Sequence, residues 1–163
     1  MVNSTRVVIA DDMEPILIYL EKTLSREDDF EVIGKAKDGE ELIEILKEKK
    51  PDLVITDQEM PKCNGLDAIK ELNDEEIKTN YILITGNSLI MSNYEKQLGV
   101  LKIIRKPILD DKKFIEQIRN SLKTKDENNI IESKIPKNET KVYSKDKKHK
   151  NIKEILNKFF KGK

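Results

Sequence analysis

Short apolar runs alternate with longer amphipathic segments through the first 122 residues of the chain. Three of the runs are almost wholly apolar, which is typical of strands that a parallel sheet buries on both faces. The pattern predicts five β-strands, at residues 5–10, 30–34, 52–56, 80–85 and 100–105.

The segments that separate the strands show the apolar spacing of helices that bury one face. Turn-forming pairs, Asp38-Gly39 and Asn64-Gly65, precede two of these segments and supply polar starts for the helices. Alternation of strand and helix five times over predicts an α/β fold, a five-stranded, doubly wound parallel sheet. The apolar helix faces are Ile16, Leu17, Leu20 and Leu24; Leu42, Ile43 and Leu46; Leu66, Ile69 and Leu72; and Phe114, Ile115, Ile118 and Leu122.

The pattern changes after residue 122, so we expect the folded domain to occupy residues 4–122. Residues 123–150 contain nine lysines and few apolar residues, a composition that predicts a flexible linker. Residues 151–161 predict a short amphipathic helix, which is marginal alone and needs a surface to dock on. Its apolar positions are Ile152, Ile155, Leu156, Phe159 and Phe160.

The net charge of zero hides a division along the chain. Residues 1–122 carry 18 Lys and Arg against 25 Asp and Glu, whereas residues 123–163 carry 13 Lys against 6 acids. The two parts therefore have net charges of −7 and +7, which motivates the hypothesis that the basic C-terminal helix docks on the acidic domain. The absence of Trp and the 5% aromatic content argue against base stacking as the main activity.

Several classes of protein are disfavoured by what the sequence lacks. The single cysteine, Cys63, excludes an intrachain disulfide and a cysteine-based zinc cluster, and it suits a reducing compartment. No apolar run approaches the roughly 18 residues of a membrane span, and the polar start has no signal-peptide core. Neither a P-loop nor a dinucleotide-binding motif is present. We expect a soluble, cytoplasmic protein.

Polar side chains lie at the ends of four predicted strands. Asp11 and Asp12 follow the first, Asp57 the third and Lys106 the fifth, while Thr85 ends the fourth. The carboxyl ends of parallel strands share one edge of a sheet, so these groups should converge. Clustered carboxylates need a cation between them, and oxygen ligands on an open rim suit Mg²⁺. A carboxylate can also act as a nucleophile and form an acyl phosphate, whose oxygens Mg²⁺, an ammonium and a hydroxyl would hold.

In this order, the motifs resemble the receiver domain of two-component response regulators over residues 4–122. The motifs are the pair Asp11-Asp12, the D-x-x-M-P-x-x-x-G run at residues 57–65, Thr85-Gly86 and Lys106-Pro107. Each is weak alone, but together, each at the end of its own strand, they are specific. The resemblance implies a flavodoxin-like (βα)5 fold.

The resemblance also implies a role for each residue. Asp57 would take a phosphoryl group from a sensor histidine kinase or a phosphotransfer protein. Thr85 and Lys106 would stabilise that group and act in the switch, and a cis peptide bond would precede Pro107. Mg²⁺ would be held by Asp11, Asp12, Asp57 and the backbone carbonyl of Glu59.

The sequence departs from the usual receiver pattern at Ile103, and it carries polar residues at two positions beside the site. Ile103 stands where receivers usually carry Tyr or Phe, which leaves the aromatic rotamer switch an open question for this chain. Glu59 and Asn87 flank the site where the family tunes the lifetime of the phosphoryl group. Glu59 also argues against a haloacid-dehalogenase-type phosphatase, which needs Asp two residues after its nucleophile.

The functional hypothesis is a phosphorylation-dependent switch in a signalling or phosphorelay pathway, without enzyme activity of its own. Residues 123–163 are too few for the usual winged-helix output domain, so we expect output by contact with an unknown downstream protein. Lysine contacts alone would give salt-sensitive, unspecific nucleic-acid binding, and neither nucleic acid nor a membrane is favoured as a partner. A phosphorylation-independent scaffold, and a regulator that binds nucleic acid through its basic tail, stay as alternatives.

Overall fold

The computed structural model of the chain describes residues 4–87 and 93–134. All five strands pair in one parallel sheet, in the order β2-β1-β3-β4-β5. The predicted α/β fold with a five-stranded parallel sheet is therefore confirmed. The first, fourth and fifth strands have the predicted bounds, whereas the second is longer and the third is shifted by one residue. The strands are β1 (Thr5–Ala10), β2 (Phe30–Ala36), β3 (Leu53–Asp57), β4 (Asn80–Thr85) and β5 (Val100–Arg105).

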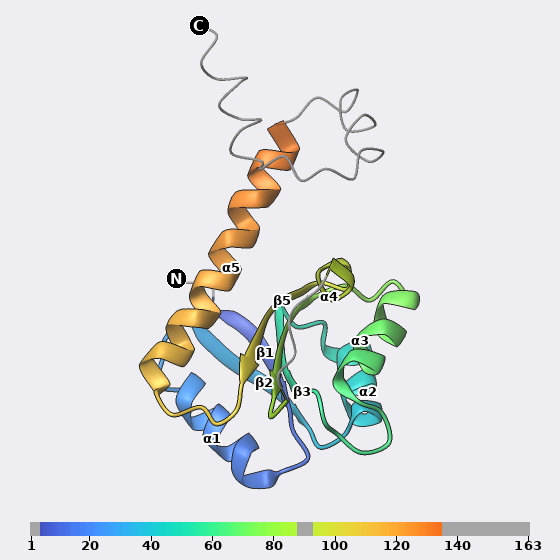
Figure 1. The fold of residues 1–163 in the computed structure, drawn as a ribbon, viewed down its shortest axis with the longest axis vertical. Helices are drawn as coiled ribbons and strands as arrows, with labels where there is room; N and C mark the ends of the chain where they lie inside the picture. The colour runs from blue at the N-terminus through green and yellow to red at the C-terminus, as the bar shows by residue number, and fades with distance from the viewer. Residues whose placement is uncertain (1–3, 88–92, 135–163) are drawn as a thin grey trace, which may run out of the picture. The chain divides into compact units, whose positions relative to one another are not determined.

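Five helices connect or follow the strands within the described residues (Figure 1). Asp38 and Asn64 cap two of them, each accepting a hydrogen bond from a backbone N–H three residues on, at 2.9 and 3.0 Å. These polar starts were predicted from the sequence, and the capping bonds supply the physical reason for them. The helices are α1 (Glu14–Leu24), α2 (Gly39–Lys49), α3 (Gly65–Asp74), α4 (Asn93–Gln97) and α5 (Asp111–Lys134).

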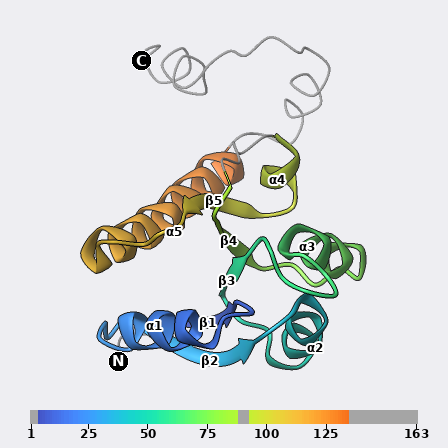
Figure 2. The same ribbon diagram turned by 60° about the horizontal axis from the view of Figure 1, so that its bottom comes forward.

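The sheet separates two apolar layers. Successive side chains of a strand point to opposite faces, so Val7 and Ile9 pack with residues of α1 and α5, while Val8 and Ala10 pack with residues of α2 and α3. Figure 2 shows the two pairs of helices on opposite sides of the strands. Helices on both faces explain why the central strands are almost wholly apolar.

The order of the strands reverses between β1 and β3. Within the sheet, β2 lies next to β1 on one side and β3 lies next to β1 on the other, so the chain crosses β1 when it passes from β2 to β3. The connections that leave β1 and β3 therefore diverge to opposite faces, and the space between them is where open α/β sheets bind ligands. Ala10 pairs with Thr56 in the register of these two strands, which brings the residues that follow each of them together.

The C-terminal boundary differs from the one expected at residue 122. Helix α5 runs on to Lys134, so residues 123–134 are helical rather than a linker. Lys and Glu are good helix formers, and no helix-breaking residue occurs before Pro136. The residues up to Lys125 form one compact unit. The rest of the expected linker and the predicted helix at 151–161 lie outside the described residues.

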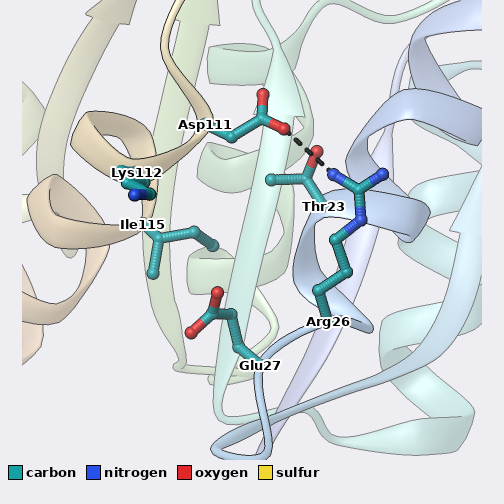
Figure 3. A pocket seen from close by; sticks show the side chains of 6 residues that line it. All are labelled: Thr23, Arg26, Glu27, Asp111, Lys112 and Ile115. Carbon is teal, nitrogen blue, oxygen red and sulfur yellow. Dashed lines mark hydrogen bonds and ion pairs between the residues drawn. The ribbon is translucent and has the colours of Figure 1, made fainter.

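A small cavity of about 210 Å³ lies between α1 and the start of α5 (Figure 3). Asp111 accepts hydrogen bonds there from the Tyr19 hydroxyl at 2.6 Å and from Arg26 at 3.2 Å. Burial and the bond to Asp111 raise the pKa of Tyr19 to about 12, so its hydroxyl stays protonated. The bonds to Asp111 connect α1 and the turn after it with α5, and none of the predicted site residues lines the cavity. Its lining residues are Thr23, Arg26, Glu27, Asp111, Lys112 and Ile115.

None of the helices described within 4–87 and 93–134 is long and apolar enough to cross a bilayer.

Candidate metal and phosphoryl site

The three acidic residues predicted to converge do lie together. One carboxylate oxygen from each of Asp11, Asp12 and Asp57 falls within 4.8 Å of the others. Asp11 and Asp57 are buried beside the central strands, whereas Asp12 is exposed and opens the cluster to water. Three oxygen donors at a partly open rim are a donor set that fits a hard divalent cation such as Mg²⁺.

Lys106 lies against the two buried carboxylates. Its Nζ donates to Asp11 Oδ2 at 2.8 Å and to Asp57 Oδ2 at 2.6 Å. The backbone N–H of Lys106 donates to Thr85 O at 2.8 Å, which ties the end of β5 to the end of β4. The peptide bond between Lys106 and Pro107 is cis. The Lys106 ammonium, which contacts both groups, offsets the repulsion between the Asp11 and Asp57 carboxylates.

Electrostatics at Asp57 reflect two opposing effects. Burial raises the pKa of the Asp57 carboxyl above its usual value, and the Lys106 ammonium opposes that rise. The backbone N–H of Glu59 donates to Asp57 Oδ1 at 3.3 Å, which holds the turn after β3 against the carboxylate. The same turn carries the Glu59 carbonyl, the fourth ligand that the resemblance implies for the metal.

A second network connects the turn after β3 with the end of β4. The Thr85 hydroxyl donates to the Glu59 carboxylate, with oxygen–oxygen distances of 3.0 and 3.2 Å. Asn87 Nδ2 donates to Glu59 Oε1 at 2.6 Å, and the Asn87 backbone N–H donates to Thr85 Oγ1 at 3.0 Å. Although burial works against it, these bonds lower the pKa of Glu59. The resemblance implies that Glu59 and Asn87 lie beside the site, but no sequence signal showed that the Glu59 side chain binds Thr85.

Contacts at its ends and in its middle hold the loop between β3 and α3. Gly65 N–H donates to Gln58 O at 3.1 Å, and a Cβ at Gly65 would collide with the carbonyl oxygen of Asp57. In the middle of the loop, Lys62 Nζ forms an ion pair with Asp38 Oδ2 at 2.7 Å. These contacts hold the loop that follows Asp57 in place.

Replacing Gly65 with Ala tests the first of these contacts. Because the new methyl would meet a carbonyl of the strand end, we expect the free energy of unfolding to fall by about 2 kcal/mol. A Cβ at Gly86 would meet no atom within 4 Å, so Gly86→Ala should change stability by less than about 0.5 kcal/mol. Urea unfolding of both variants measures the difference, and equal midpoints would contradict the close approach at Gly65.

Replacing Asp38 with Asn tests the second contact through its pH dependence. The Lys62 ammonium and the Glu41 N–H lower the pKa of Asp38 from its ordinary 3.8. A carboxyl with a lowered pKa adds stability above its unfolded pKa and loses it as pH falls through the folded value. Asn keeps the helix cap but loses the charge. The free energy of unfolding of wild type should therefore exceed that of the variant by about 0.5 kcal/mol at pH 7. Denaturation at several pH values should show this gap closing below about pH 4; a constant gap would exclude the charge as its cause.

Comparisons with known proteins agree with this arrangement. The family model described as "Response regulator receiver domain" matches residues 7–130. The chain is similar to the transcriptional regulatory protein PdtaR of Mycobacterium tuberculosis, at 34% identity over 102 residues, 63% of this chain and 49% of that protein. It is also similar to the uncharacterized transcriptional regulatory protein YhcZ of Bacillus subtilis, at 39% identity over 83 residues, 51% of this chain and 39% of that one. The chain therefore spans about half the length of these relatives, or less.

Solved structures give the same result for the fold. The response regulator domain of Thermotoga maritima CheB is similar with a TM-score of 0.65 and 26% identity, over 74% of this chain and 98% of that chain. The receiver domain of AraT, a response regulator from Geobacillus stearothermophilus, has a TM-score of 0.64 and 27% identity, over 79% and 99% of the two chains. With the family match covering residues 7–130, this chain belongs to the receiver domain family of two-component response regulators.

Proposed function

We propose that this chain is a phosphoacceptor that takes a phosphoryl group on Asp57 with the help of Mg²⁺. The observation that carries the proposal is the position of the Asp57 carboxylate, buried between the Lys106 ammonium and the oxygens of Asp11 and Asp12. A buried carboxylate with a cation on one side and metal ligands on the other is equipped for nucleophilic attack on phosphorus.

The residues divide the work of phosphoryl transfer between them. An Asp57 oxygen attacks the phosphorus of a phosphohistidine, the P–N bond breaks, and its electron pair returns to the imidazole of the donor. Lys106, already 2.6 Å from Asp57 Oδ2, offsets negative charge throughout the step. Asp11 and Asp12, together with Asp57 and the Glu59 carbonyl, would hold Mg²⁺, which supplies further charge neutralisation to the phosphoryl oxygens.

Phosphoryl transfer provides the direct test. Incubation with acetyl phosphate and Mg²⁺ should add the mass of one phosphoryl group to the intact chain, and EDTA should prevent the gain. Borohydride reduction of the acyl phosphate, followed by peptide mass analysis, should locate the group at Asp57. If neither acetyl phosphate nor a protein donor adds the mass, and Mg²⁺ does not bind, the chain is a phosphorylation-independent scaffold.

The docking surface for the donor is proposed from the exposed apolar residues near the site. In the described part of the chain the large exposed hydrophobic side chains are Met13, Ile18 and Leu109, of which Leu109 is 87% exposed. Met13 follows Asp12 directly, and Leu109 lies three residues after Lys106. A protein that brings a phosphohistidine to Asp57 has to cover the surface around the carboxylate. We therefore infer that a sensor kinase or phosphotransfer protein packs on Met13 and Leu109.

The variant Leu109→Ser tests this surface. Removing an exposed apolar anchor should slow transfer from a protein donor that phosphorylates wild type, by about tenfold. The rate with acetyl phosphate should stay unchanged, because that small donor needs no apolar rim. Parallel rate measurements with the two donors distinguish the cases. Equal slowing with both donors would show that Leu109 acts on the site itself instead of on docking.

For the 163 residues of this chain we propose output by protein–protein contact. Support comes from residues 123–163, which are rich in lysine and hold too few apolar residues for a second core of ordinary size. A curated relative from Lawsonia intracellularis, a protein-glutamate methylesterase/protein-glutamine glutaminase, is matched over 20% of its length, so its activity is not carried over. Nucleic-acid binding through the basic tail would be supported by DNA binding that survives physiological salt.

A further inference from the structure

We propose that Glu59 is a positioning residue, whose carboxylate engages the Thr85 hydroxyl until a phosphoryl group on Asp57 displaces it. This inference rests on the proposed phosphorylation of Asp57. It concerns what the Thr85 hydroxyl binds before phosphorylation, which is separate from the lifetime of the phosphoryl group.

The hydrogen bonds at Thr85 leave its hydroxyl with nothing further to donate. A hydroxyl has one proton to give, and the Glu59 oxygens lie 3.0 and 3.2 Å from Thr85 Oγ1. The backbone N–H of Asn87 donates to the same Oγ1 at 3.0 Å, so the oxygen accepts from Asn87 and donates to Glu59. Thr85 is wholly buried, so water does not compete for this bond at the Thr85 side.

The Glu59 side chain is held in place from a second direction. Asn87 Nδ2 donates to Glu59 Oε1 at 2.6 Å, so the carboxylate is bound by two side chains from the end of β4 and the turn after it. The Thr85 backbone is meanwhile fixed by its pairing with Arg105 in β5 and by the bond from the Lys106 N–H. A threonine with a fixed backbone moves its hydroxyl only by a jump between rotamers.

Binding of Thr85 to Glu59 and to a phosphoryl oxygen are therefore alternatives. The single hydroxyl proton serves one acceptor at a time, and both acceptors are anionic. The free energy of the Thr85–Glu59 hydrogen bond has to be given up when Thr85 binds a phosphoryl group. This bond therefore lowers the affinity of the site for a phosphoryl group and shifts the equilibrium toward the unphosphorylated arrangement. Loss of the Glu59 carboxylate should tighten phosphoryl binding, and it should do so through Thr85.

A double-mutant cycle on the full chain tests this, with beryllofluoride and Mg²⁺ as the phosphoryl mimic. We expect Glu59→Ala to bind the mimic about tenfold more tightly than wild type, because a hydrogen bond to a charged group no longer competes. Glu59→Gln, which keeps a weaker neutral acceptor, should fall between the two. In a Thr85→Val background, Glu59→Ala should change the affinity by less than about twofold, since no hydroxyl remains to be released.

The outcomes separate the mechanisms. An equal gain with Thr85 and with Val at this position would mean that Glu59 only repels the anion, and it would overturn the inference. Urea unfolding of wild type, Glu59→Ala, Thr85→Val and the double variant, without the mimic, adds an independent readout, because a Glu59–Thr85 bond requires coupling between the two substitutions. Absence of coupling would likewise overturn it. Coupling together with no mimic binding in any variant would instead overturn the proposed phosphorylation, and with it the displacement of Glu59.

Discussion

Replacing Asp57 with Asn is expected to abolish phosphorylation completely and, in Mg²⁺-free buffer, to raise the free energy of unfolding. The amide oxygen is a poor nucleophile, so no acyl phosphate forms and the phosphoryl mass gain disappears. The second effect follows from the charge balance of the pocket, where one ammonium serves two buried carboxylates.

The stability effect has a definite sign because the charges are buried. With Asp57 neutral, the Lys106 ammonium pairs with Asp11 alone, and the repulsion between like charges is removed. We expect a gain of about 1 kcal/mol in Mg²⁺-free buffer. Added Mg²⁺ should stabilise wild type more than the variant, because it binds the native acidic cluster and loses a ligand when Asp57 is replaced.

Intact mass after acetyl phosphate treatment and urea unfolding with and without Mg²⁺ measure the two effects. Asp74→Asn is the matched control, since this exposed carboxyl at the end of α3 should alter neither readout. A phosphoryl gain retained in Asp57→Asn would place the acceptor elsewhere. A loss of stability in Mg²⁺-free buffer would show that Asp57 contributes more through its bond to Lys106 than it costs through repulsion.

Replacing Lys106 with Met should have the larger effect on stability. The substitution leaves two carboxylates, 1% and 4% exposed, without their shared cation. Removing one partner of a buried ion pair is strongly destabilising, and we expect the free energy of unfolding to fall by about 3 kcal/mol in Mg²⁺-free buffer. Mg²⁺ should restore part of this loss because it offers the carboxylates another cation.

Urea unfolding of Lys106→Met with and without Mg²⁺ measures this change. Two controls bear on its cause. Lys113→Met removes an exposed ammonium in the first turn of α5 and should change stability by less than about 0.5 kcal/mol. Adding Asp57→Asn to Lys106→Met should recover stability, because one of the two unpaired charges is gone. If the double variant is no more stable than Lys106→Met, the loss comes from side-chain packing.

The fold was predictable because its signals are local. The apolar runs mark the strands, the helical spacing marks α1, α2, α3 and the start of α5, and Asp38 and Asn64 mark two helix starts. The end of α5 was missed because a lysine-rich segment reads as a linker by composition, although its residues also favour helix. Local preference alone does not decide between these two states.

The candidate site divides in the same way. The sequence by itself determined that Asp11, Asp12, Asp57, Thr85 and Lys106 lie at or next to the ends of strands and should share one edge, because parallel strands align their carboxyl ends. Only the tertiary structure decided that Glu59 accepts the Thr85 hydroxyl and that Lys62 pairs with Asp38. These contacts join residues that are 26 and 24 positions apart, and they depend on strand register, loop path and side-chain rotamer. Residue spacing along a chain encodes periodicity, but it does not encode which of several nearby polar groups a side chain meets.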